Sequence, residues 1–251
     1  MLVLENVTQR YRQGSRVRVA LNDVSLVVEP GELVGVWGTR RSGRSTLLRV
    51  AAGIELAQEG RVMFAGRDLA RHRDEVLGGE IGFCQMSFAS VEGGCVGEQV
   101  AAPLLARRVA PAVARCRAEA MLERAGVADC AWRDPCELDP AEVARVSIAR
   151  ALMTDPGLLV VDEPTSGVGA VARDPLLALL RSVANEGCAV LMSVGEASEL
   201  SGVDRAMSMV EGVLRGAAES ASADVLPLRR PVPGRDRGLD GGGRREGAGG
   251  V

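Results

Sequence analysis

The sequence has no lysine at all, a single histidine and very few aromatic residues. All 30 basic side chains are therefore arginines, and aromatic residues make up 2% of the chain. A reaction that depends on a catalytic lysine, or on two histidines, is excluded. Few rings are present to stack on bases, and a formal net charge of −3 creates no basic field, so the composition disfavours nucleic acid as a partner.

Long apolar runs and paired cysteines are also missing. The six cysteines form no C-x-x-C pair, and no run of about 18 apolar residues could span a bilayer. Glu5 interrupts the start of the chain, which lacks the layout of a signal peptide. We therefore expect a reduced, cytoplasmic setting in which any membrane contact is made through a partner. What is present is 47% hydrophobic residues in 251, enough for the core of one large domain or of two small ones.

Hydrophobic periodicity predicts an α/β organisation. Residues 1–37 have strand-like patterns with a turn at 29–32, and a second hairpin is expected at 60–66. Apolar runs at 157–164 and 188–193 enclose an amphipathic helix at 175–185, an alternation that favours a mostly parallel sheet. Residues from about 88 to 152 show helical periodicity and predict a helical insert. The Gly-, Pro- and Arg-rich residues 216–251 predict a disordered tail after a domain that spans 1–215.

A glycine loop stands between a predicted strand and a predicted helix. It resembles the phosphate loop G-x-x-x-x-G-K-[ST], in which backbone N–H groups surround phosphates, the lysine reaches them and the hydroxyl binds Mg²⁺. Arg44 occupies the lysine position. A surface turn is the alternative, but a strand before and a helix after favour an anion site. The residues expected to bind phosphate are Gly38, Thr39, Arg40, Arg41, Ser42, Gly43, Arg44, Ser45 and Thr46.

Two carboxylates end the apolar run at 157–164. In a nucleotide site, Asp162 would hold Mg²⁺ and Glu163 would orient or deprotonate water. A solvated acidic strand end is the alternative reading. The glycine loop earlier in the same chain makes the nucleotide reading the stronger one.

These segments resemble the nucleotide-binding subunits of ABC transporters, particularly the lipoprotein-release and macrolide-efflux branch, over residues 1 to about 214. The resemblance is carried by D-E-P-T-S-G at 162–167, R-V-S-I-A-R-A-L at 145–152 and the stretches at 20–26 and 29–32. It implies a P-loop NTPase fold of the RecA-like type, with an antiparallel β subdomain at the N-terminus and a helical subdomain. It also implies that Tyr11 stacks on adenine and that Gln85 senses the γ-phosphate, acting with Glu163 in catalysis and with Ser45 and Asp162 on the metal.

The same resemblance implies ligands, partners and location. The ligands are ATP and Mg²⁺, and the partners are a second nucleotide-binding subunit, identical or different, and transmembrane permease subunits. The chain would be cytoplasmic and peripheral at the inner face of the membrane, and would work in an exporter. An ABC-type ATPase acting on DNA is disfavoured, because the chain has no coiled-coil insertion or zinc module.

The sequence departs from the family at four places that hydrolysis uses. Besides Arg44, the signature L-S-G-G-Q is replaced by L-D-P-A-E at 138–142, Gly169 replaces an acid and Gly195 replaces the switch histidine. Asp139 with Pro140 and Glu142 predicts a well-capped helix start that clamps phosphate poorly. We therefore expect nucleotide binding with impaired hydrolysis. The alternative is a non-hydrolysing scaffold or nucleotide sensor.

Four aromatic residues other than Tyr11 are expected to have a structural role. Trp37, Phe64, Phe83 and Trp132 are expected to pack rather than to recognise a ligand.

Overall fold

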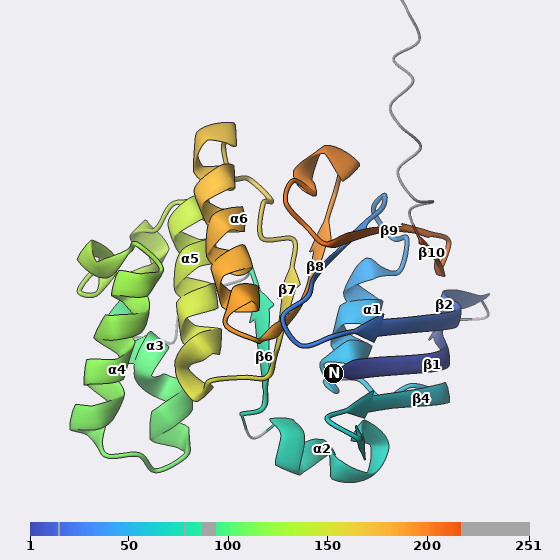
Figure 1. The fold of residues 1–251 in the computed structure, drawn as a ribbon, viewed down its shortest axis with the longest axis horizontal. Coiled ribbons are helices and arrows are strands. Elements are labelled where there is room, and N and C mark those ends of the chain that lie inside the picture. The colour runs from blue at the N-terminus through green and yellow to red at the C-terminus, as the bar shows by residue number, and fades with distance from the viewer. Residues whose placement is uncertain (15, 78, 87–93, 217–251) are drawn as a thin grey trace, which may run out of the picture. The chain divides into compact units, whose positions relative to one another are not determined.

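Ten strands in two sheets and six α-helices make up the part of the chain that the structure describes (Figure 1). The structure is a computed structural model and describes residues 1–14, 16–77, 79–86 and 94–216, which lie in the compact unit Met1–Ala217. The predicted tail lies outside the described residues, except Gly216. The strands are β1 Leu2–Gln13, β2 Arg16–Val28, β3 Leu33–Trp37, β4 Glu59–Phe64, β5 Arg67–Asp68, β6 Ile81–Gln85, β7 Leu158–Asp162, β8 Ala189–Val194, β9 Arg205–Val210 and β10 Val213–Gly216. The helices are α1 Arg44–Ala51, α2 Leu69–Leu77, α3 Val96–Ala106, α4 Pro111–Arg124, α5 Pro140–Ala151 and α6 Ala170–Asn185.

The larger sheet has the strand order β10-β9-β3-β8-β7-β6. All neighbouring strands in it run parallel except β10, which pairs with β9 as a hairpin. Every residue of β8 is buried, and so are the first four of β3 and of β7, which is typical of a parallel sheet covered on both faces. The mostly parallel sheet predicted from the apolar runs is confirmed.

The smaller sheet is antiparallel, in the order β2-β1-β4-β5. The hairpin of β1 and β2 places Tyr11 opposite Arg18, and β4 pairs with β5 at the predicted second hairpin. Gly60 begins this hairpin at φ 85°, where a Cβ would lie 2.4 Å from the carbonyl oxygens of both Glu5 and Asn6. The predicted N-terminal antiparallel part is therefore present.

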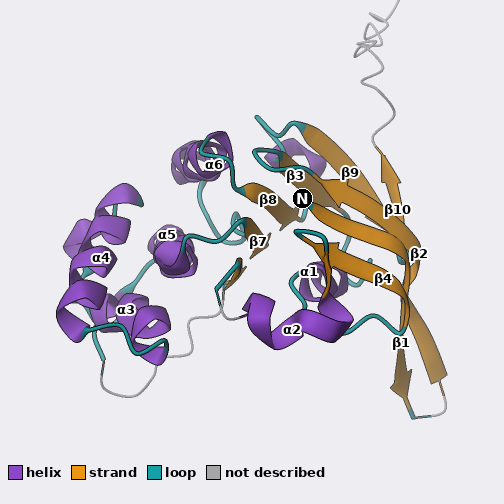
Figure 2. Cartoon of the chain, turned by 60° about the horizontal axis from the view of Figure 1, so that its bottom comes forward, coloured by secondary structure: helices purple, strands orange, loops and turns teal. Residues whose placement is uncertain are grey.

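Helix α1 lies between the two sheets, and α5 and α6 cover the opposite face of the parallel sheet (Figure 2). Two apolar cores result. One joins α1 to both sheets through residues such as Leu47, Leu48 and Leu191; the other joins the parallel sheet to α3, α4, α5 and α6. This layering puts the N-terminus of α1 at the carboxyl ends of the parallel strands.

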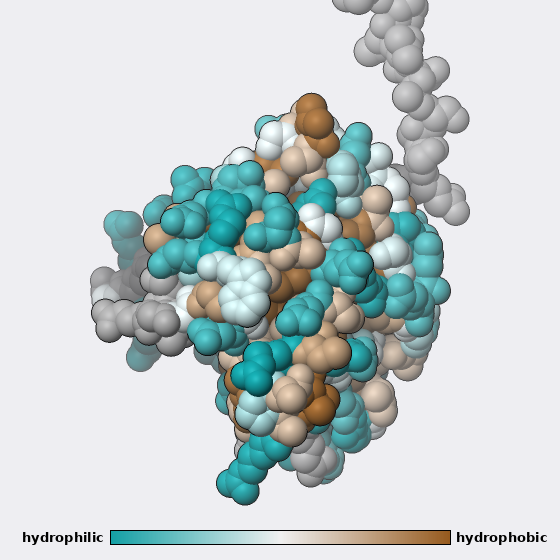
Figure 3. All heavy atoms as spheres, turned by 90° about the vertical axis from the view of Figure 1, so that its left-hand side faces the viewer, coloured by the Kyte–Doolittle hydropathy of each residue, from teal (hydrophilic) through white to brown (hydrophobic). Residues whose placement is uncertain are grey.

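Helices α3, α4 and α5 occupy the chain between β6 and β7, where the sequence predicts a helical insert. On the side of the molecule that carries α3 and α4, polar side chains surround scattered apolar ones (Figure 3). Trp132 follows α4 and is 83% exposed, so the expectation that it packs is wrong. Its neighbours Ala128–Cys130 form a 3₁₀ turn that buries Cys130 rather than the indole ring. Phe64 is buried, and Trp37 and Phe83 pack against the cores as expected.

None of the helices in the described ranges is both long enough and apolar enough to cross a membrane.

Candidate functional site

The glycine loop joins the end of β3 to the start of α1. Gly43 is the N-cap residue of α1 at φ 114°, a conformation that L side chains rarely adopt, and its carbonyl accepts the first helical bond from Leu47 N at 2.9 Å. A Cβ at Gly43 would lie 2.2 Å from the Ala20 carbonyl oxygen, and one at Gly38 would lie 2.4 Å from the Met209 carbonyl oxygen. Both glycines are therefore required by the fold of the loop itself.

A cavity of about 740 Å³ opens over this loop. It lies at the N-terminus of α1, where unpaired backbone N–H groups favour an anion. It is lined by Tyr11, Arg18, Ala20, Arg40, Arg41, Ser42, Gly43, Arg44, Ser45, Thr46 and Glu163. The structure thus brings together the aromatic residue, most of the loop and one of the two carboxylates that the sequence singled out.

Arg44 is the one buried arginine of the loop, with 6% of its side chain exposed. Its Nη2 donates to Glu163 Oε1 at 2.7 Å, and its Nη1 donates to the carbonyl oxygen of Val194 at the end of β8. The guanidinium therefore spans the carboxyl ends of two strands. Its charge is matched by the carboxylate that the sequence assigned to catalysis.

Ser193 organises the two carboxylates and was not identified from the sequence. This fully buried serine donates from Oγ to Asp162 Oδ1 at 2.6 Å and accepts from the backbone N–H of Glu163 at 3.1 Å. Glu163 has a positive φ of 52°, so its backbone is held in a conformation that is unusual for a non-glycine residue. The signal was available, because Ser193 is the only polar residue in the apolar run of β8.

Tyr11 is held by its hydroxyl group. The phenol donates to the Glu55 carboxylate, with oxygen–oxygen distances of 2.6 and 2.7 Å, and Glu55 also accepts from Arg49 Nε at 3.3 Å. The ring thereby lines the loop cavity from the β1 side. Glu55, which fixes the tyrosine ring, lies just after α1 and belongs to no motif by which it could have been identified from the sequence.

Four predicted residues lie outside the lining of the loop cavity, and Asp162 is one of them. Thr39 lines a neighbouring cavity, and Gly38 is buried beneath Ser42, whose Oγ would be 2.8 Å from a Cβ at Gly38. Gln85 is exposed at the end of β6, where it pairs in register with Asp162 of β7.

The proposed metal donors are a hydroxyl, an amide and a carboxylate, from Ser45, Gln85 and Asp162. Oxygen donors of this kind are those that Mg²⁺ prefers. Asp162 uses Oδ1 for Ser193, which leaves its second oxygen for a metal. The donor set therefore fits Mg²⁺.

The start of α5 satisfies its own backbone, as predicted. Asp139 accepts from Glu142 N at 2.8 Å, Glu142 accepts from Asp139 N at 2.9 Å, and Pro140 occupies the first turn. Arg133 Nη1 also donates to Glu142 at 2.7 Å. Both carboxylates of the altered signature are thus engaged within their own helix terminus.

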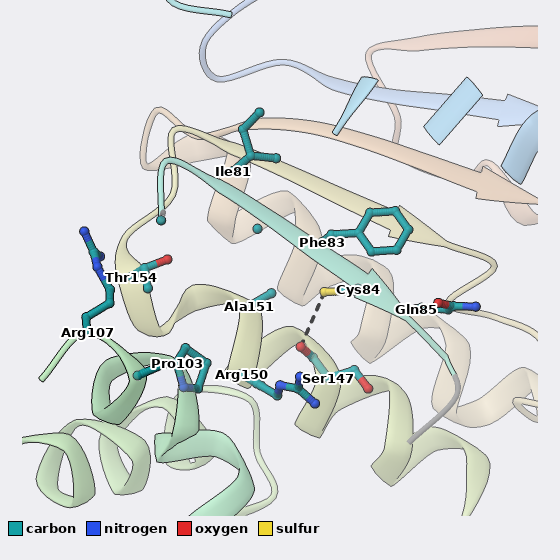
Figure 4. A pocket seen from close by; sticks show the side chains of 13 residues that line it. Ile81, Phe83, Cys84, Gln85, Pro103, Arg107, Ser147, Arg150, Ala151 and Thr154 are labelled. Atoms are coloured by element: carbon teal, nitrogen blue, oxygen red, sulfur yellow. Dashed lines mark hydrogen bonds between the residues drawn. The ribbon is translucent and has the colours of Figure 1, made fainter. Parts of the chain in front are cut away.

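A second cavity, of about 530 Å³, lies between β6 and helices α3 and α5 (Figure 4). Phe83, Cys84 and Gln85 line it from β6, and Cys84 Sγ lies 3.4 Å from the Ser147 carbonyl oxygen of α5. Burial raises the pKa of the Cys84 thiol to about 12, so this sulfur is protonated and unreactive at neutral pH. Arg107 and Arg150 also line the cavity, and no carboxylate does so among the described residues.

Comparison with known proteins places this geometry in a family. The ABC transporter family model matches residues 21–166. The lipoprotein-releasing system ATP-binding protein LolD of Chromohalobacter salexigens is 34% identical over 219 residues, which cover 85% of this chain and 92% of that protein. LolD of Pseudomonas syringae pv. tomato is 33% identical, over 85% of this chain and 96% of that one.

A solved structure agrees with the sequence relatives. The ATP-binding cassette MJ0796, described as a dimer in a post-hydrolysis state bound to ADP and Pi, superposes with a TM-score of 0.79 at 25% identity. The match covers 87% of this chain and 99% of MJ0796. The predicted fold class, a P-loop NTPase fold with antiparallel and helical parts, is confirmed. The chain belongs to the ABC transporter family, as a nucleotide-binding subunit of the lipoprotein-release branch.

Proposed function

We propose that the chain binds ATP in the loop cavity as the ATP-binding subunit of an exporter and that it hydrolyses ATP poorly. The observation that carries the proposal is the meeting of the glycine loop, the N-terminus of α1 and arginine side chains in one cavity. Backbone N–H groups and guanidinium groups are the donors that recognise phosphate oxygens. Ser45 and Thr46 add hydroxyl groups at the first turn of the helix, and Tyr11 supplies a ring for the base.

Mg²⁺ would be held by Ser45, Asp162 and Gln85. When bound, it would supply charge that stabilises the phosphoryl group. Glu163 would orient or deprotonate the attacking water, with Gln85 beside the γ-phosphate. The ion pair of Glu163 with Arg44 opposes this role, because a carboxylate that accepts a hydrogen bond from a guanidinium group at 2.7 Å is less available to a water molecule.

The Arg44–Glu163 pair also favours the second candidate function, a nucleotide-binding scaffold or sensor without turnover. Gly195 offers no side chain where the family has a histidine; its N–H donates to Glu199 at 3.1 Å. Removal of transition-state contacts or proton-transfer groups costs about 10²–10⁴ each in rate. Several such losses would leave binding without appreciable hydrolysis.

The partners would be a second nucleotide-binding subunit and a permease. In a head-to-tail pair, the N-terminus of α5 in one subunit would face the loop cavity of the other. The permease would dock at the second cavity, next to Gln85 and the inserted helices, where the exposed Arg107 suits a docking segment with an acidic side chain. The chain would then lie at the inner face of the membrane through this contact.

A fluorescent-nucleotide titration tests the binding proposal. Because valine at Gly43 would collide with the Ala20 carbonyl, that substitution would report on folding as well as on binding. Charge reversal at the exposed loop residue Arg40 avoids this problem, and the exposed α4 residue Arg115 provides a matched control. We expect Arg40→Glu to weaken binding at least tenfold and Arg115→Glu to leave it unchanged. Equal binding by wild type and Arg40→Glu would show that the loop is not the phosphate site.

Phosphate release in the steady state separates the two functions. Turnover that Glu163→Gln abolishes supports an ATPase, and binding without turnover supports the scaffold or sensor. The assay is made on the chain alone and with co-expressed permease and nucleotide-binding subunits, because an isolated subunit can lack a complete site.

A further inference from the structure

The loop cavity carries more positive charge than its own carboxylates balance. Four arginines line it, and Glu163 is the one carboxylate among its lining residues. Glu163 already pairs with Arg44 at 2.7 Å. No carboxylate of the described residues lies within ion-pair distance of the other three, Arg18, Arg40 and Arg41, which we call the arginine cluster.

The backbone holds the arginine cluster at the mouth of the cavity. Arg18 Nη2 donates to the Arg41 carbonyl oxygen, which ties strand β2 to the loop. Within the loop, Ser42 N donates to the Thr39 carbonyl at 3.1 Å, and Gly212 N donates to the Ser42 carbonyl at 2.8 Å. Arg41 adopts a positive φ of 65°. All three side chains of the cluster are exposed, so they can reach a ligand without leaving a buried partner.

The buried hydroxyl group of Ser42 is a second indication of a ligand at the arginine cluster. Ser42 is 4% exposed, and its Oγ has no hydrogen-bond partner among the described residues. It lines both the loop cavity and a neighbouring cavity of about 510 Å³, and the arginine cluster lines both cavities too. Glu211 is the one carboxylate that lines this neighbouring cavity. An unsatisfied buried hydroxyl is unfavourable, and a phosphate oxygen would satisfy it.

We propose that the arginine cluster neutralises a nucleoside triphosphate in place of a divalent cation, so that this chain binds the metal-free nucleotide at least as tightly as its magnesium complex. The inference rests on the proposed nucleotide binding. Guanidinium groups bind phosphate oxygens in bidentate fashion, and their attraction grows with the charge of the ligand. Mg²⁺ would neutralise part of the charge of the nucleotide. The binding free energy gained through Asp162 and Ser45 would therefore be offset by a weaker attraction to the arginine cluster. Magnesium would then contribute more to phosphoryl-transfer chemistry than to the affinity for the nucleotide.

The test compares nucleotide affinity with and without magnesium. A fluorescent ATP analogue is titrated into the full chain in excess MgCl₂ and in excess EDTA at constant ionic strength. For the wild type, we expect the Kd in EDTA to be equal to or lower than the Kd in magnesium. For Arg40→Gln with Arg41→Gln, we expect the Kd in EDTA to weaken by about 10- to 100-fold, as the loss of charge-assisted hydrogen bonds predicts, and the Kd in magnesium to change less. Arg115→Gln is the matched control and keeps the wild-type ratio.

The outcomes separate the two proposals. A wild-type Kd that is more than about threefold weaker in EDTA than in magnesium overturns the inference and leaves nucleotide binding in place. A double variant that stays independent of magnesium also overturns it, because the arginines would not be the cause. Absence of binding in both buffers contradicts the proposed function itself. The salt dependence gives a second readout, because the double variant should show a shallower loss of affinity with salt than the wild type.

Discussion

Substitution of Arg44 by alanine gives the sharpest test of the site geometry. The change removes a hydrogen bond to Glu163 at 2.7 Å and one to the Val194 carbonyl. Glu163 is 41% exposed and can take up water when its partner is lost, so that contact counts at the low end of charge-assisted bonds. Val194 is fully buried, so its carbonyl loses a partner where water has little access. With the space left by the side chain, the free energy of unfolding should fall by about 2–4 kcal/mol.

Urea denaturation followed by circular dichroism measures this loss. A fall of 3 kcal/mol corresponds to about 6–12 °C in Tm for a domain of this size. The exposed Arg115→Ala on α4 should cost less than about 0.5 kcal/mol. A double-mutant cycle with Glu163→Gln should show a coupling of about 1 kcal/mol between the two residues. If Arg44→Ala were as mild as Arg115→Ala, the bridge between the strand ends would not exist, and reduced hydrolysis could no longer be attributed to the Arg44–Glu163 pair.

Three further predictions concern residues away from the loop. Asp139→Ala removes the reciprocal cap with Glu142 and should lower stability by about 1 kcal/mol in urea melts, with no effect if the cap is unimportant. Hydrogen bonds from an arginine and from the first amide of β3 lower the pKa of Asp204; its stabilisation should therefore be full above about pH 4 and disappear as the pH falls through the lowered pKa. Asp204→Asn should accordingly differ from wild type at pH 7, by about 1 kcal/mol, and converge with it at lower pH. Iodoacetamide at pH 8 should modify exposed Cys116 and spare buried Cys84 until the chain unfolds, as peptide mass mapping would reveal.

Residue spacing and periodicity predicted the local elements of the site: the glycine loop, the carboxylates at the strand end and the helix cap. The glycine loop was recognisable because strand, Gly38, Gly43 and helix follow one another within a few residues, so local sequence determines local structure. Asp162 and Glu163 were recognisable because they end an apolar run. The cap at Asp139 was predicted for the same reason, since its partners lie within one helical turn.

Contacts between distant segments could not be predicted in this way. Arg44 meets Glu163 and Val194 only because the sheet order places β7 and β8 next to the loop. The presence of an arginine in a motif does not show which carboxylate, distant in the sequence, it will pair with. The position of Arg18 beside the site could have been predicted, because the hairpin register that pairs it with Tyr11 follows from a turn near Gly14. Trp132 was predicted wrongly because a general preference of tryptophan for burial was applied to a loop residue, and the neighbouring 3₁₀ turn buries Cys130 instead.

The fixed position of Tyr11 has a consequence for selectivity. Its hydroxyl group is anchored to Glu55, which in turn accepts from Arg49 of α1, so hydrogen bonds link this aromatic wall of the cavity to the helix. In the proposed complex, the base would meet a tyrosine whose rotamer is already fixed, so binding would lose little side-chain entropy there. Discrimination among nucleotides at this wall should therefore arise from the shape of the base rather than from adjustment of the protein.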